Sequence, residues 1–164
     1  MIRFVTWSGH SWLGLLARLY LGYVFISACL HKIAHPGVFA LDIATYDILP
    51  LALVNPMAIC LPYIELAAGV MLILGLRTRA AALMVWGMMV MFVVAVSIAL
   101  ANGLDASCGC FASQALEEDP ISYKTILRDV GWLLLSMYVL MMDRHVLGVD
   151  RLLWRTNPGR RIDA

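Results

Sequence analysis

Two cysteines in the last third of the chain are separated by a single glycine, in the sequence Ser107-Cys108-Gly109-Cys110-Phe111. One intervening residue brings the two thiols close together, and glycine lets the backbone turn sharply between them. A disulfide in so tight a ring would be strained, and strained, exposed disulfides exchange more readily than structural ones. The pattern therefore favours redox exchange at Cys108 and Cys110. A static disulfide and the binding of a soft metal such as copper by thiolates are the alternatives.

The two other cysteines, Cys29 and Cys60, lie within apolar stretches. We expect both on the same side of the membrane as the Cys-Gly-Cys turn. One hypothesis is that they form a second redox pair, which relays electrons from Cys108 and Cys110. The alternative is that both are small buried apolar side chains, a common role for free cysteine.

Ionisable residues also interrupt the apolar stretches. A lone charge inside a membrane is costly, so such residues usually face the bundle interior and pair with one another. We predict one pair between Arg18 and Glu65 and a second between Lys32 and Asp129. Together with Arg128, Lys32 is also a candidate for a polar pocket that binds a quinone-like head group. The alternative is that these charges only hold and orient the helices. No metal site is predicted.

The composition indicates that these residues are embedded in lipid. Hydrophobic residues make up 62% of the 164 residues and charged residues only 14%, and the mean hydropathy is +0.84. A soluble domain is nearer half apolar and a quarter charged. The net charge of +1 gives no indication of a nucleic-acid partner.

The apolar stretches predict an all-α fold. A helix needs about 20 mostly apolar residues to cross a bilayer. We predict one membrane domain over residues 1–164, an integral membrane four-helix bundle with a basic tail over 143–164. The four predicted helices cover roughly residues 13–34, 54–76, 80–101 and 122–142. The proline-bounded segment 36–50 is too short and polar to cross, which favours a short interfacial or re-entrant helix.

The distribution of charge predicts the orientation. Arginine and lysine near membrane helices mark the cytoplasmic side. Basic residues cluster before the first helix, between the second and third and in the tail, at Arg3, Arg77, Arg79, Arg144, Arg151, Arg155, Arg160 and Arg161. The other two loops are acidic, with Asp42, Asp47, Asp105, Glu117, Glu118 and Asp119. We therefore expect a multi-pass protein of the bacterial inner membrane with both termini in the cytoplasm. The Cys-Gly-Cys turn then faces outward, where disulfides persist.

Most of residues 12–142 follow a pattern that resembles a known family. Its elements are Arg18 with Leu21-Gly22, Lys32 before a proline, Phe39, Tyr46, Leu49-Pro50, Leu61-Pro62, Glu65, Gly69, Leu74-Gly75, Arg77, Arg79 and Cys108-Gly109-Cys110-Phe111. Together they resemble the DoxX-like superfamily, and within it the methylamine-utilisation MauE type. Where the family pattern has a second glycine after the phenylalanine, this chain has Ala112.

The resemblance implies a four-helix inner-membrane protein that helps to form disulfides or to mature a periplasmic partner. DoxX-type relatives are linked to quinone-dependent sulfur oxidation. The leading hypothesis is therefore a membrane thiol–disulfide protein that acts on a periplasmic or membrane partner, with quinone as a possible electron acceptor. An accessory subunit that anchors a larger redox or photosynthetic complex is the second hypothesis. A small-solute or metal transporter, suggested by Glu65, is the third.

Overall fold

The computed structural model describes residues 9–104 and 123–142, and all regular secondary structure within these ranges is helical. The helices are α1 (Gly9–Ala34), α2 (Pro36–Thr45), α3 (Leu51–Leu74), α4 (Thr78–Ala101) and α5 (Tyr123–Met142). They correspond to the expected helices, but α1 begins four residues before the predicted start and α3 begins three residues before its own. The predicted tail and the Cys-Gly-Cys turn lie outside the described residues.

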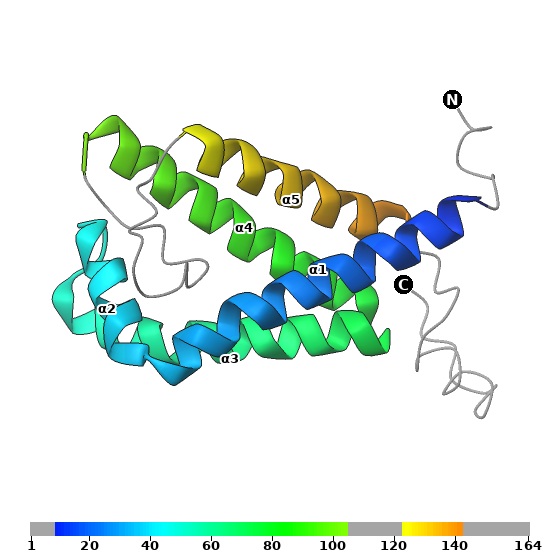
Figure 1. Ribbon diagram of the computed structural model, residues 1–164, viewed down its shortest axis with the longest axis horizontal. Coiled ribbons are helices and arrows are strands. Elements are labelled where there is room, and N and C mark those ends of the chain that lie inside the picture. The colour runs from blue at the N-terminus through cyan, green and yellow to red at the C-terminus, as the bar shows by residue number, and fades with distance from the viewer. Residues whose placement is uncertain (1–8, 105–122, 143–164) are drawn as a thin grey trace.

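The four long helices form two pairs. In Figure 1, α1 runs beside α3 and α4 runs beside α5, and both pairings are extensive contacts. The short helix α2 lies at the end of the bundle where α1 ends and α3 begins, which we call the α2 end. Because α4 and α5 run in opposite directions, the last turn of α4 and the first turn of α5 also lie at the α2 end (Figure 1).

Local sequence explains where the helices break. Pro36 is the first residue of α2, a position where its missing backbone N–H costs no hydrogen bond, and its ring disfavours helical backbone at His35, so α1 ends at Ala34. At the opposite end of the bundle, α3 stops at Gly75, whose positive φ of 68° is the left-handed conformation that glycine adopts without strain. This turn leads directly into α4.

Two glycines set how closely α1 and α3 approach. A Cβ placed on Gly22 would lie 2.9 Å from the carbonyl oxygen of Gly69, and one placed on Gly69 would lie 3.1 Å from the carbonyl oxygen of Gly22. Small residues at such a crossing let two membrane helices pack backbone against backbone. The rest of the core is apolar and includes Leu21 and Phe25 of α1, Leu72 of α3, Val85 of α4 and Val139 of α5.

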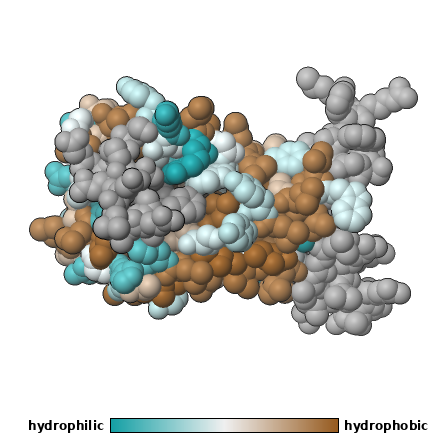
Figure 2. Space-filling model, viewed as in Figure 1, coloured by the Kyte–Doolittle hydropathy of each residue, from teal (hydrophilic) through white to brown (hydrophobic). Residues whose placement is uncertain are grey.

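Within residues 9–104 and 123–142, three helices are long and apolar enough to cross a membrane: α1 from Trp12 to Ala34, α3 and α4. Many large apolar side chains point outward, among them Leu16, Leu53 and Val94, which is the arrangement expected where lipid is the solvent. Figure 2 shows this as continuous brown surface along the bundle, with teal residues gathered toward the α2 end. α5 carries Lys124, Arg128 and Asp129 and does not reach the same apolarity, so a fourth crossing stays a prediction.

Candidate functional site

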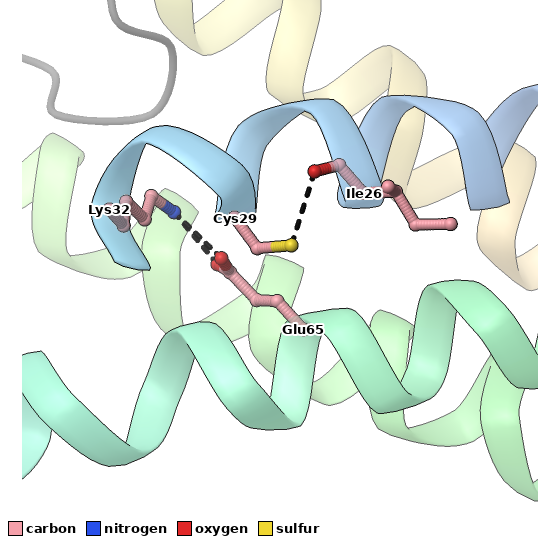
Figure 3. Close-up of polar contacts among 4 residues, drawn as sticks. All are labelled: Ile26, Cys29, Lys32 and Glu65. Carbon is pink, nitrogen blue, oxygen red and sulfur yellow. Dashed lines mark hydrogen bonds and ion pairs between the residues drawn. The ribbon is translucent and has the colours of Figure 1, made fainter. Parts of the chain in front are cut away.

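A buried ion pair joins α1 to α3 near the α2 end. The Nζ atom of Lys32 donates hydrogen bonds to both carboxylate oxygens of Glu65, each at 2.9 Å. Both side chains are at least nine-tenths buried, and Figure 3 shows them pointing toward each other from facing helices. The Lys32 ammonium also lies 4.9 Å from the centre of the Phe39 ring of α2, a cation–π contact. Three helices are thereby tied together by one ammonium group.

This pairing corrects the prediction that Glu65 pairs with Arg18. The helices α1 and α3 are antiparallel and cross where Gly22 meets Gly69. Glu65 precedes Gly69 by four residues, so it lies level with residues that follow Gly22. Arg18 precedes Gly22 by four residues and therefore lies on the opposite side of the crossing. Arg18 is nevertheless buried, at 2% exposure, and has contacts of its own.

The second predicted pair, between Lys32 and Asp129, is also not formed. Asp129 accepts a hydrogen bond from the Nε atom of its neighbour Arg128, at 3.2 Å, and Lys32 is already held by Glu65. Asp129 is almost fully buried, whereas the Arg128 side chain is about one-third exposed. The Arg128 guanidinium also lies 4.9 Å from the centre of the Trp132 ring. Arg128 and Asp129 thus offset each other within α5.

The structure does not bring Cys29 and Cys60 together as a redox pair. Cys29 is fully buried in α1, where its thiol donates a hydrogen bond to the carbonyl oxygen of Ile26 at 3.1 Å. Figure 3 shows it beside Glu65. Cys60 is exposed on α3, about 140° around that helix from Glu65. Both thiols are free. Cys29 therefore matches the alternative of a buried small side chain, and Cys60 faces outward.

Next to the ion pair is a cavity of about 360 Å³. Lys32, Glu65 and Asp42 supply charged groups to its wall, and aromatic and aliphatic side chains from all five helices supply the rest. Its aromatic residues are Phe25, Phe39, Tyr46, Phe92 and Trp132, and its methionines are Met57, Met88, Met89 and Met91. Burial raises the pKa of the Asp42 carboxyl above its usual value, against the opposing influence of His31 and Lys32.

Sequence reasoning placed Lys32 in a polar pocket but missed most of the wall. Arg128 does not line the cavity; it stacks on Trp132, which does. The sequence offered no signal for Asp42, Phe92 and Trp132 as neighbours, because they come from three helices whose relative positions depend on the fold. Among the described residues, no three His, Cys, Asp or Glu side chains are close enough to hold a metal ion.

Cys108 and Cys110 lie outside the described residues, but the helix ends that flank them are described. Tyr46 packs in one apolar cluster with Leu104, which follows α4, and with Ile126 of the first turn of α5. The same Tyr46 lines the cavity. The described residues on either side of the Cys-Gly-Cys segment therefore both lie at the α2 end, close to the cavity.

The sequence was compared with known protein families. The model of the family "Methylamine utilisation protein MauE" matches residues 10–142, which include every described helix except the first residue of α1. The chain belongs to the MauE family. The matched region and the three long apolar helices make it a multi-pass membrane protein. The wider DoxX-like resemblance stays a prediction from sequence pattern.

Three curated MauE proteins are similar to the chain. It is 31% identical over 115 residues to methylamine utilization protein MauE of Methylorubrum extorquens, a match that covers 70% of this chain and 61% of the relative. The protein of the same name from Paracoccus denitrificans is 27% identical, with 69% and 60% covered. The one from Methylophilus methylotrophus is 25% identical, with 83% and 72% covered. The chain thus spans about three-fifths of the first two relatives. No solved structure matches it.

Proposed function

We propose that this MauE-family protein is a thiol–disulfide protein of the bacterial inner membrane, which matures a partner protein on the outer side. The proposal rests on the Cys-Gly-Cys turn and on the family, whose members are named for methylamine utilisation. Both termini lie in the cytoplasm in this proposal. The partner then meets Cys108 and Cys110 in the oxidising compartment.

The reaction is an exchange of one disulfide. A thiolate of the partner attacks one sulfur of the Cys108–Cys110 bond, which breaks and leaves a mixed disulfide and one free thiolate. The second thiolate of the partner then attacks the mixed disulfide. A disulfide forms in the partner, and both cysteines of the turn are left reduced. Two electrons and two protons must leave the protein before the next cycle.

One observation carries this proposal beyond the family relationship. Through Tyr46, the helix ends that flank the cysteine segment pack against the wall of the cavity beside Lys32 and Glu65. Cys108 follows Leu104 by only four residues, a reach of at most about 14 Å. In this proposal, an electron acceptor bound in the cavity takes the electrons of the reduced turn. This supports a redox role over a disulfide that only holds a loop.

The decisive experiment replaces the two cysteines one at a time in the full chain. We expect Cys108→Ser and Cys110→Ser each to abolish disulfide formation in the partner, because each removes one sulfur of the exchanging bond. Cys60→Ser is the matched control, since Cys60 faces outward, away from the ion pair, and should leave maturation unchanged. The thiol state of the partner, measured by alkylation and mass spectrometry, is the readout. Normal partner oxidation in both loop variants would refute the proposal.

The same variants separate the alternative hypotheses. An accessory subunit would retain its role with both loop cysteines replaced and would co-purify with a large complex in fixed stoichiometry. The transporter hypothesis depended on Glu65 as a charge in the middle of a helix. Because both Glu65 oxygens accept hydrogen bonds from Lys32, that carboxylate is already neutralised, and this support is lost.

A further inference from the structure

The cavity at the α2 end has a mostly apolar wall that also contains charged side chains. Aromatic rings from α2, α4, α5 and the α2–α3 connection line it, and the Lys32–Glu65 pair contributes the polar group. We propose that this cavity binds the head group of a membrane-soluble quinone. The inference rests on the proposed function, in that it names the chemical class of the electron acceptor for the cysteine turn.

The charges of the wall select a neutral ligand. Lys32 contributes one positive charge, and Glu65 and Asp42 contribute two carboxylates, so an anion would meet net repulsion. An ammonium group has three N–H donors, and the two bonds to Glu65 leave one of them. A quinone carbonyl is a neutral acceptor for that donor. The hydroxyl of the reduced quinol can donate to the Asp42 carboxylate, so both redox states find a partner.

The shape of the wall favours a flat ring. Phe39, Tyr46, Phe92 and Trp132 come from different parts of the fold and line one space, and aromatic faces stack on planar rings. A volume of about 360 Å³ is at the small end of ligand pockets. The cavity therefore has room for a head group, and a long isoprenoid tail would extend into lipid.

The cavity also has an exit toward the membrane. Its lining includes Met91, Val94 and Ile98 of α4, whose side chains are 41%, 51% and 41% exposed on the apolar outer face. A ligand dissolved in the lipid would reach the aromatic wall past these residues without crossing water. A water-soluble electron acceptor would have to pass through lipid to enter from this side.

The redox step balances with this acceptor. The two thiols of the turn lose two protons and two electrons as their S–S bond forms, and a quinone takes up two electrons and two protons to become a quinol. Glu65 and Asp42 lie in the wall of the cavity as carboxylates that can hydrogen-bond the quinol hydroxyls.

The test is photolabelling of the full chain in lipid nanodiscs with a short-tailed azidoquinone. We expect the label on peptides that contain residues 39–49 and 88–98, and we expect excess unlabelled quinone to compete for it.

Met91→Trp should reduce labelling at least tenfold by filling the cavity. Met84→Trp is the matched control, because Met84 lies two turns away on the same face of α4, is equally exposed and does not line the cavity. Ala95→Phe, which puts a ring at a second position of the wall, is the second variant and should also reduce labelling.

Several outcomes would overturn the inference. Labelling spread along the lipid face of α3 and α4 without competition would show that quinone only dissolves in the bilayer. Equal labelling of the Met91→Trp, Ala95→Phe and Met84→Trp proteins would place the site elsewhere. A phospholipid retained in native mass spectrometry and not displaced by quinone would identify an acyl-chain pocket instead.

A further variant separates this inference from the proposed function. The double replacement Cys108→Ser/Cys110→Ser should bind quinone with unchanged affinity, because the described residues that line the cavity include no cysteine. If partner oxidation proves independent of the cysteines while this variant still binds, the quinone site stands without the thiol reaction. If the cysteines are essential and no competed labelling is found, the thiol reaction stands and its acceptor binds elsewhere.

Discussion

At Lys32, an ammonium and a carboxylate meet inside an otherwise apolar bundle. A buried charge is tolerated only where an opposite charge and hydrogen bonds replace its hydration. Glu65 provides both, with two hydrogen bonds of 2.9 Å, and the Phe39 ring covers a further side of the ammonium. This pair positions the polar group of the cavity and at the same time ties α1, α2 and α3 together.

Removing the lysine should therefore destabilise the fold more than the loss of a surface charge. Lys32→Met leaves the Glu65 carboxylate buried without its partner, and we expect a loss of about 3 kcal/mol in the free energy of unfolding. Lys124→Met, on the exposed first turn of α5, is the control and should cost under about 0.5 kcal/mol. Unfolding in mixed detergent micelles measures both. The double variant Lys32→Met/Glu65→Met should recover most of the loss, and equal stability of Lys32→Met and Lys124→Met would contradict this account.

At the scale of the helices, the crossing of α1 over α3 fixes which residues are level with one another. Gly22 and Gly69 allow each backbone to contact the other. The register that results brings Lys32 to Glu65 and leaves Arg18 beyond the crossing. The cavity depends on the same register, since its wall combines residues from both helices with residues of α2, α4 and α5.

A methyl group at the crossing should separate the two helices. In Gly22→Ala, the new Cβ would lie 2.6 Å from Cγ1 of Ile73 and 2.9 Å from the backbone oxygen of Gly69, and the backbone oxygen cannot rotate away. We expect a destabilisation of about 1–3 kcal/mol in the same unfolding assay. Gly87→Ala is the matched control: no atom lies within 4 Å of its Cβ, so alanine should stabilise α4 by up to about 1 kcal/mol. Equal effects of the two substitutions would show that the crossing is not tight.

At the scale of the whole molecule, the number of membrane crossings decides on which side the tail lies. Among the helices that the structure describes, three are long and apolar enough to span, and α5 carries three charged residues near its start. Arg128 and Asp129 balance each other within α5, and Asp129 is buried against the bundle. This local neutralisation lowers the cost of placing α5 in the membrane.

We therefore expect α5 to complete a fourth crossing, with the C-terminus in the cytoplasm. A green fluorescent protein fused after residue 164 should fluoresce, because it matures only in the cytoplasm, and alkaline phosphatase at the same position should be inactive. Fusions of both reporters after Leu104 should give the reverse pattern. Phosphatase activity at the C-terminus would mean that α5 does not cross and would place the tail on the outer side.

The sequence by itself determined the membrane character, the approximate extent of each helix, the short helix between the first two long ones and the family. These follow from hydropathy, proline positions and local motifs, which depend on neighbours along the chain. It also singled out Arg18, Lys32, Glu65 and Asp129, all of which the structure buries.

Only the tertiary structure decided which of these charges pair, because pairing depends on where two helices cross. The glycines allow a close approach, but the register emerges from the packing of both helices along their length. The cavity likewise exists only when five helices are assembled, so no single stretch of sequence predicts its wall.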